Sequence, residues 1–295
     1  MELAAVYKRD GWVRVPGLID GEQIDRMLAA YAADLRPSRS KFYRQNTNRY
    51  EPNRIDGHGH VTNSFLDPHN YRRLPRVRQA VLDILFAPPL KAALADATGY
   101  GRLDLMQSML FDKNAATTPH QDWWYLDSVP NGQLAAAWIA LEDIPAAAGR
   151  FYLMSGSHEM TLHDDLRSLR HGHWLRLMRD HVDANADRID AQAMRRGDVI
   201  IWNSRTIHGA LPTQDPSLSR KSLTAHYLPE GMAFGNLFVT KNWVTMTNDG
   251  PYRYFANQAE YSPAADLKAR LKLAAYNHPS LMRAARMVQR LLRHG

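Results

Sequence analysis

The 295-residue chain contains no cysteine and no run of apolar residues long enough to cross a lipid bilayer. The first absence excludes disulfide bonds, cysteine-ligated zinc, iron–sulfur clusters and a thiol nucleophile. Any metal ion must therefore be held by His, Asp or Glu. The second absence excludes an integral membrane protein. Lys8, Arg9 and Asp10 interrupt the short apolar stretch near the start, so we expect no secretory signal and a cytoplasmic location.

The sequence also lacks a band of one-signed charge, although its formal net charge is +7. Basic residues are interspersed with Asp, and the densest basic stretches lie at 167–181 and at the C-terminal end. Because nucleic-acid binding leaves a concentrated basic face, we expect no nucleic-acid partner. An anionic small molecule or a membrane surface fits this distribution better. The 45% of apolar residues is sufficient for a buried core.

Short β-like segments separated by Gly, Pro, Asn and Asp occupy the middle of the chain. They lie at 105–111, 135–141, 151–154, 198–202, 222–228 and 236–240. Another strand is predicted at 12–15, and residues 74–99 are helical with a break at Pro88–Pro89. This order predicts a mainly β protein with flanking helices, folded as a jelly-roll or cupin-like double-sheet barrel. We expect a single domain over 1–295, with helical support at 1–99, the barrel core at about 100–240 and a helical tail at 241–295.

Three further segments carry separate expectations. Residues 42–71 are polar and aperiodic, which predicts a long loop. Residues 155–196 form an insertion rich in His and Arg, which is either a solvated charged helix or a lid that presents cations to an anionic substrate. Residues 279–295 form a basic amphipathic helix that packs on the domain, contacts a second subunit or lies peripherally on an anionic membrane.

The chain contains several His-x-Asp triplets, so the triplet alone identifies no site. They are His120–Asp122, His163–Asp165 and His181–Asp183. A facial triad of two His and one carboxylate holds Fe(II) and leaves three coordination positions open. Only the first pair follows an early strand and leaves room for further strands before another histidine, His208. The spacing therefore favours His120, Asp122 and His208 as metal ligands.

Arg220 opens the next predicted strand, and alternation places Arg220, Ser222, Thr224 and His226 on one face. A 2-oxoacid can chelate the iron in two positions while a deep Arg and Ser hold its distal carboxylate. Arg suits this role because its planar fork binds a carboxylate through two parallel hydrogen bonds.

An ordered set of strings carries a family resemblance: TPHQDWWY, AAAWIAL, GRFYLMSGSH, IHGALP and RKSLTAHYLP, preceded by YKRDGWVRVPGLID. From about residue 5 to 230 the chain resembles the phytanoyl-CoA dioxygenase family of Fe(II)/2-oxoglutarate oxygenases. The resemblance implies a double-stranded β-helix, with O2 and 2-oxoglutarate as cosubstrates. It implies His120, Asp122 and His208 as the iron ligands and Arg220 as the anchor of the 2-oxoglutarate C5 carboxylate. Secondary pocket residues would be Ser222, Gln121, Trp138 and Gln107.

Halogenating relatives have a small residue in place of the carboxylate ligand, so the presence of Asp122 favours hydroxylation of an unactivated C–H bond. The expected substrate is a polar, anionic small molecule, a glycan or lipid-linked sugar, or an acyl intermediate. Trp123, Trp124 and Arg150 are the candidate substrate contacts, with core packing as the alternative for the two tryptophans. A ligand-binding barrel without catalytic turnover is the alternative function.

Overall fold

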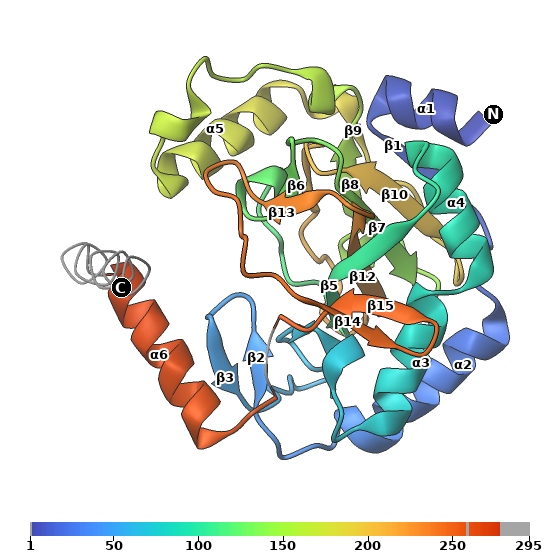
Figure 1. Cartoon of the computed structure of the whole chain (residues 1–295). Helices are drawn as coiled ribbons and strands as arrows, with labels where there is room; N and C mark the ends of the chain where they lie inside the picture. Colours follow the sequence, from blue (N-terminus) through green and yellow to red (C-terminus); the bar gives the residue numbers. More distant parts are fainter. Residues whose placement is uncertain (1, 258–259, 278–295) are drawn as a thin grey trace, which may run out of the picture.

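The computed structural model describes residues 2–257 and 260–277 (Figure 1). Its main feature is an eight-stranded sheet in which the neighbouring strands pair antiparallel, apart from a parallel bridge between β15 and β5. In spatial order the strands are β1 (Trp12–Val15), β10 (Val199–Asn203), β7 (Ala135–Ala140), β12 (Ser222–Pro229), β5 (Leu103–Phe111), β15 (Tyr252–Phe255) and β14 (Met246–Asp249), with β4 (Phe65–Leu66) paired to β5.

Smaller sheets face the large sheet and close the barrel. They consist of β11 (His208–Ala210), β8 (Phe151–Met154) and β9 (Ile189–Asp190), and of β6 (Asp127–Val129) paired with β13 (Ala233–Gly235). Trp138 of β7 stacks on Phe151 of β8 with ring centroids 5.7 Å apart, and Phe151 also contacts Trp202 of β10. The large sheet and the β11–β8–β9 sheet therefore share an aromatic interior, as the predicted jelly roll requires.

Four helices cover the outer face of the large sheet (Figure 1). They are α1 (Glu2–Asp10), α2 (Gly21–Ala30), α3 (Pro75–Leu85) and α4 (Pro88–Thr98). The predicted break at Pro88–Pro89 is confirmed, because Pro88 cannot continue α3 but fits the first position of α4. On β12 the side chains of Leu223, Ala225 and Tyr227 pack on this helical side. Alternation therefore turns the intervening residues toward the barrel interior.

The insertion at 155–196 contains α5 (His171–Ala184), which packs on the small sheet (Figure 1). Trp174, Met178 and Val182 recur every four residues and are buried against Tyr152 and Met154. One stripe of α5 thus belongs to the core, while its other side chains remain outside. Shorter helical turns complete the connections: η1 (Tyr31–Leu35), η2 (Pro68–Asn70), η3 (Asp122–Trp124), η4 (Ala146–Ala148), η5 (Ser157–Glu159), η6 (Leu166–Ser168) and η7 (Ala186–Arg188).

Two sequence predictions of local structure were wrong. Residues 42–71 are not a simple loop, because β2 (Phe42–Arg44), β3 (Arg49–Glu51) and β4 form there. The polar character misled the prediction: Arg44 is buried, with its guanidinium bonded to Asn53 and to the Ser64 carbonyl. The strand expected at 236–240 is instead a turn after β13, in which the Asn236 side chain accepts bonds from the amides of Phe238 and Val239.

The predicted helical tail at 241–295 is also partly wrong. Residues 246–255 form the β14–β15 hairpin, which joins the large sheet because β15 runs beside β5. Only then does α6 (Pro263–Asn277) begin, and it packs on β3. The predicted amphipathic helix at 279–295 lies outside the described residues. Among the helices of the described part, none combines the length and apolar character needed to span a membrane.

Candidate metal centre

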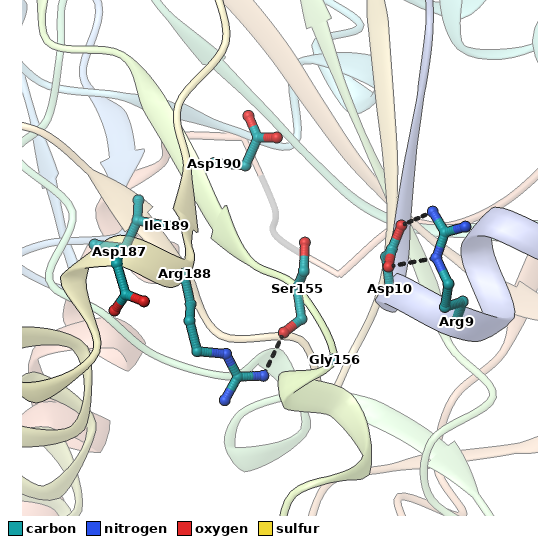
Figure 2. A pocket seen from close by; sticks show the side chains of 8 residues that line it. All are labelled: Arg9, Asp10, Ser155, Gly156, Asp187, Arg188, Ile189 and Asp190. Carbon is teal, nitrogen blue, oxygen red and sulfur yellow. Dashed lines mark hydrogen bonds and ion pairs between the residues drawn. The ribbon is translucent and has the colours of Figure 1, made fainter.

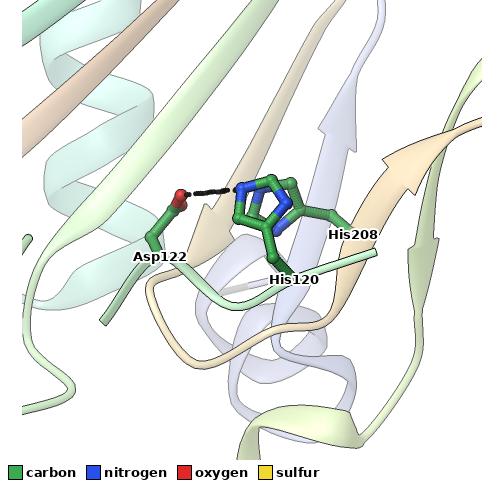
Figure 3. Close-up of side chains that lie close together, drawn as sticks. All are labelled: His120, Asp122 and His208. Atoms are coloured by element: carbon green, nitrogen blue, oxygen red, sulfur yellow. Dashed lines mark ion pairs between the residues drawn. The ribbon is translucent and has the colours of Figure 1, made fainter. Parts of the chain in front are cut away.

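His120 and His208 lie opposite each other across a two-residue antiparallel bridge. The His120 amide donates to the His208 carbonyl and the His208 amide donates to the His120 carbonyl, each at 3.0 Å. Their ring centroids are 4.3 Å apart. Asp122 begins η3, and this turn directs its carboxylate back toward both rings (Figure 3). One ligand atom from each of the three residues lies within 4.8 Å of the others.

The hydrogen bonds around the two imidazoles leave the correct nitrogens available for a metal ion. His120 Nδ1 lies 2.8 Å from the Thr118 carbonyl, and His208 Nδ1 lies 2.9 Å from the Thr206 carbonyl. A carbonyl can only accept, so each Nδ1 carries the proton and each Nε2 presents a lone pair. Both Nε2 atoms face Asp122 Oδ1, at 3.6 Å from His120 and 3.5 Å from His208.

Burial and charge set the protonation states of this group. Burial lowers the pKa of His208 to about 4, although the nearby Asp122 acts in the opposite direction. Burial alone would raise the pKa of Asp122, but His208, His226 and His120 together hold that pKa well below its usual value. At neutral pH the centre therefore offers a neutral His208 and an ionised carboxylate, which are the forms that bind a divalent ion.

The second oxygen of Asp122 is held from the large sheet. Trp202 Nε1 donates to Asp122 Oδ2 at 2.9 Å, and His226 Nε2 lies 3.4 Å from the same oxygen. Trp202 comes from β10 and His226 from β12. The sequence placed His226 on the interior face but gave no reason to connect either residue with Asp122. Contact across 80 or more residues cannot be inferred from local spacing.

Ser222 is the first residue of β12 and Arg220 lies two residues before it, so the strand predicted to open at Arg220 begins later. Both side chains are almost completely buried. The Arg220 guanidinium donates from Nη1 to the Gly149 carbonyl at 3.2 Å and lies 5.9 Å from the Trp138 ring, and no carboxylate of the described residues pairs with it. Its Nε and the Ser222 hydroxyl have no hydrogen-bond partner within the described chain. Burial lowers the pKa of Arg220 to about 10, so it remains a cation at neutral pH. A buried cation and hydroxyl without an anion fit an acidic ligand.

Trp138 and Gln107 also face the barrel interior. Trp138 is in register with Thr224, and Gln107 is in register with His226. Trp138 Nε1 and Gln107 Oε1 are buried and find no partner among the described residues. Gln121 is different, because its position between two ligands turns it to the other side. Its amide accepts from Trp123 Nε1 and donates to the Arg205 carbonyl, so it braces the surrounding loops.

The candidate substrate residues occupy three different environments. Trp124 is buried and stacks on Trp174 at 4.4 Å, which is core packing. Trp123 is partly buried, and the Arg205 guanidinium lies 4.8 Å from its ring. Arg150 is partly buried in the turn before β8 and donates to the Ala191 carbonyl at 3.4 Å.

Tyr125 was missed by the sequence reasoning, although it follows the singled-out Trp124. Its ring lies edge-on to the His120 ring at 5.8 Å, and 39% of the residue is exposed. Its hydroxyl lies 2.7 Å from His171 Nε2, at the start of α5. The insertion therefore reaches the exposed side of the metal centre.

The remaining histidines stay separate from this centre. His158 Nε2 lies 3.1 Å from the Lys8 carbonyl, which agrees with a loop hydrogen-bonding role. Within the part of the chain that the structure describes, neither the His163–Asp165 triplet nor the His181–Asp183 triplet gathers into a candidate metal group.

A hollow with a volume of about 510 Å³ lies elsewhere (Figure 2). It is lined by Arg9, Asp10, Ser155, Gly156, Asp187, Arg188, Ile189 and Asp190. Arg9 is paired with Asp10, and Arg188 donates to the Ser155 carbonyl at 2.9 Å. Its cations are thus already engaged, and it shares no residue with the metal centre.

A jelly-roll barrel that brings two imidazoles and one carboxylate to a single point defines the class of non-haem iron oxygenases. The chain belongs to the phytanoyl-CoA dioxygenase (PhyH) family, whose model matches residues 7–222. The family, the barrel fold and the enzyme class expected from the sequence are therefore confirmed, and the class is that of iron enzymes dependent on 2-oxoglutarate.

Solved structures of the same fold include SnoN, SnoK and EctD. The non-haem α-ketoglutarate-dependent epimerase SnoN from nogalamycin biosynthesis has a TM-score of 0.57 and 22% identity, over 86% of this chain and 97% of SnoN. The carbocyclase SnoK from the same biosynthesis has a TM-score of 0.58 and 19% identity, over 80% and 87%. EctD from S. alaskensis with bound Fe has a TM-score of 0.55 and 17% identity, over 80% and 78%. No curated protein matches the chain by sequence.

Proposed function

We propose that the chain is an Fe(II)/2-oxoglutarate-dependent hydroxylase in which His120, Asp122 and His208 hold the iron. The observation that carries this proposal is the position of Asp122 Oδ1, which lies within 3.6 Å of the Nε2 atoms of both histidines. The Nδ1 protons are committed to backbone carbonyls, so all three ligand atoms are free to bind one ion. When bound, iron with 2-oxoglutarate and O2 supplies the oxidation of an unactivated C–H bond.

Arg220 and Ser222 are the residues we assign to the distal carboxylate of 2-oxoglutarate. Both are buried and both have unmet hydrogen-bonding capacity, Ser222 at the start of β12 and Arg220 two residues before it. The guanidinium supplies the charge and two parallel donors, and the hydroxyl supplies a third. Trp138 and Gln107 line the same interior and are proposed to orient the cosubstrate, whereas Gln121 supports the loop that carries the ligands. The aromatic interior excludes water from the reacting groups.

The substrate we propose is a polar, anionic small molecule, with a glycan, a lipid-linked sugar and an acyl intermediate as the classes to test. Support comes from a cation that lies near the ligand set: Arg205 lies over Trp123, the residue after Asp122. His171 is hydrogen-bonded to Tyr125 beside His120, but burial lowers the pKa of His171, so it offers a neutral polar contact at neutral pH. Within the described chain Arg205 forms no ion pair with an acidic residue, so its charge is available to an anion. Arg150 belongs to the same proposal as a more distant cation.

Location and partners are proposed from the composition of the chain. We propose a cytoplasmic enzyme without a nucleic-acid partner, whose basic segment at 279–295 makes peripheral contact with the inner membrane surface or with a second subunit. The support is compositional, since this segment contains Arg283, Arg286, Arg290 and Arg293 and no acidic residue.

Anaerobic addition of Fe(II) and 2-oxoglutarate tests the proposed function. The wild-type protein should develop the weak visible charge-transfer band of the chelate. Asp122→Ala should abolish the band and lower metal affinity by at least about 100-fold, because it removes one of three ligands and an ionised charge. Asp165→Ala is the matched control, since it alters the carboxylate of another His-x-Asp triplet and should leave the band unchanged.

The alternative, a binding barrel without turnover, makes a different prediction. It would show no such band in the wild-type protein and no succinate release with any candidate substrate. A charge-transfer band together with succinate release supports the hydroxylase, and the absence of both supports the binding barrel.

A further inference from the structure

The two oxygens of Asp122 have different surroundings. Oδ1 faces His120 and His208 at 3.6 and 3.5 Å, on the side where the three ligand atoms converge. Oδ2 faces the large sheet, where Trp202 Nε1 donates to it at 2.9 Å and His226 Nε2 lies at 3.4 Å. The carboxylate is thus divided into one oxygen for a metal ion and one oxygen for the protein.

Rigid elements place both large-sheet residues. Trp202 lies on β10 in register with Ala136, and His226 lies on β12 in register with the same residue of β7. The two rings are in edge-to-face contact at 6.2 Å and 79°. Both side chains are almost completely buried. Because three neighbouring strands fix this pair, the positions of the Trp202 N–H and the His226 ring relative to Oδ2 are set by the fold.

Packing alone does not explain a histidine at position 226. Neither ring nitrogen meets hydrogen-bond geometry with a partner in the described chain, although Nε2 lies 3.4 Å from Asp122 Oδ2, and the facing Gln107 also has an unpartnered oxygen. An apolar residue would avoid the cost of burying these polar atoms. Asp122 is the charged group within reach of Nε2, so the contact with Oδ2 is the feature that the histidine provides.

The number of ligand atoms on the metal ion depends on this second oxygen. A carboxylate that binds through one oxygen completes a triad with three open positions. If Oδ2 also turned to the ion, the protein would fill a fourth position and two would remain. A chelating 2-oxoacid needs two positions and O2 needs another, so a two-oxygen Asp122 would compete with one of them.

We propose that Trp202 and His226 are positioning residues that keep Asp122 bound to the metal through Oδ1 alone, Trp202 by donating its N–H to Oδ2 and His226 by placing its ring against the same oxygen. This inference rests on the proposed function, because it concerns the coordination number that the cosubstrates require. It assigns no direct contact with substrate or cosubstrate to either residue.

Infrared difference spectra test this proposal without any cosubstrate. In Co(II)-loaded minus metal-free protein, a carboxylate bound through one oxygen shows a wide splitting between its asymmetric and symmetric stretches, and a two-oxygen carboxylate shows a narrow one. Wild-type protein should show the wide splitting, whereas His226→Phe and Trp202→Phe should show the narrow one. His226→Gln keeps a polar side chain at this position and should restore the wide splitting. Trp174→Phe is the matched control for a buried indole remote from Asp122.

Affinities supply the second readout. A residue that merely orients a ligand costs about 10- to 100-fold in metal affinity when it is removed. A residue that limits Asp122 to one oxygen has another signature: metal affinity stays within about threefold of wild type while 2-oxoglutarate affinity, followed anaerobically by the charge-transfer band, weakens by about tenfold. Circular dichroism on each variant shows whether the fold is retained, and the milder His226→Gln variant remains informative if a phenylalanine variant does not fold.

Three results would overturn the proposal: a narrow splitting in wild-type protein, a wide splitting in both phenylalanine variants, or loss of metal affinity with unchanged 2-oxoglutarate affinity. Absence of the charge-transfer band in wild-type protein would instead count against the proposed function. The infrared result with Co(II) would still decide how Asp122 binds.

Discussion

Two clusters of buried polar side chains lie on opposite faces of the large sheet. On the outer face, Ser108 Oγ lies 2.6 Å from His69 Nδ1, His69 Nε2 lies 3.2 Å from the Phe255 carbonyl, and Asp67 Oδ1 accepts the Ser108 amide at 3.1 Å. On the inner face are Arg220 and Ser222, whose Nε and hydroxyl have no partner among the described residues. The side chains of the outer cluster are hydrogen-bonded to one another and to the backbone, whereas the inner cluster has a single bond, from Arg220 Nη1 to the Gly149 carbonyl.

The outer cluster contains the residue types of a hydrolase triad, yet its surroundings exclude that role. His69 and Ser108 are completely buried, and both ring nitrogens of His69 are occupied. A nucleophile must be reached by its substrate, so these residues instead join η2 to β5 and β15. The comparison shows that residue types and proximity do not define a site. Unmet hydrogen-bonding capacity in a buried position is the better indicator of a ligand.

The largest effect in this comparison is expected for Arg220→Ala. The change removes a buried cation and its charge-assisted contacts with a carboxylate, so 2-oxoglutarate affinity should fall by roughly 100-fold. Iron content should stay near the wild-type value because no metal ligand is lost. Anaerobic titration of 2-oxoglutarate into Fe(II)-loaded protein measures the first quantity and metal analysis the second. Arg220→Lys keeps the charge but not the planar fork and should give an intermediate affinity; unchanged affinity in Arg220→Ala would move the anchor elsewhere.

The outer cluster should instead control the pH dependence of stability. Burial lowers the pKa of His69 to about 4, from an ordinary value near 6.5. Between these values the unfolded chain binds a proton that the folded chain does not, so acidification favours unfolding. The free energy of unfolding should therefore fall by about 2 kcal/mol from this group between pH 7.5 and pH 5, roughly 1.4 kcal/mol for each unit below 6.5.

Urea unfolding of wild-type protein and His69→Gln at the two pH values measures this contribution. The variant should lose less stability on acidification than the wild type, because glutamine does not titrate. Equal losses in the two proteins would show that His69 is not the titrating group.

The architecture was largely predictable from the sequence because alternation and helical spacing are local properties. The strands at 105–111, 135–141, 151–154, 198–202 and 222–228 are confirmed, within one or two residues at their ends. The β14–β15 hairpin was missed, because its strands are only four residues each and gain their stability from pairing beside β5. Polar segments such as 42–71 also misled the reasoning where polar side chains are buried with partners.

The site likewise has a part that the sequence predicted and a part that it did not. Order and spacing along the chain were sufficient to select His120, Asp122 and His208 from several His-x-Asp triplets, and alternation placed Arg220, Ser222 and His226 on one face. The contacts of Trp202 with Asp122 and of Tyr125 with His171 could not be predicted. They depend on how segments far apart in the sequence pack against one another.

The smallest effect, and the most direct test of the comparison, comes from two matched serine substitutions on adjacent strands. Ser222→Ala removes a buried hydroxyl that has no partner within the described chain, so the stability of the ligand-free protein should stay the same or rise. Affinity for 2-oxoglutarate should weaken by about tenfold, because one donor to its carboxylate is lost. Ser108→Ala leaves His69 Nδ1 without its partner and should cost roughly 1–3 kcal/mol of stability with no change in 2-oxoglutarate affinity. Urea unfolding and anaerobic titration on both variants give the four values. If Ser222→Ala destabilises the protein as Ser108→Ala does and leaves cosubstrate affinity unchanged, the inner cluster is structural as well.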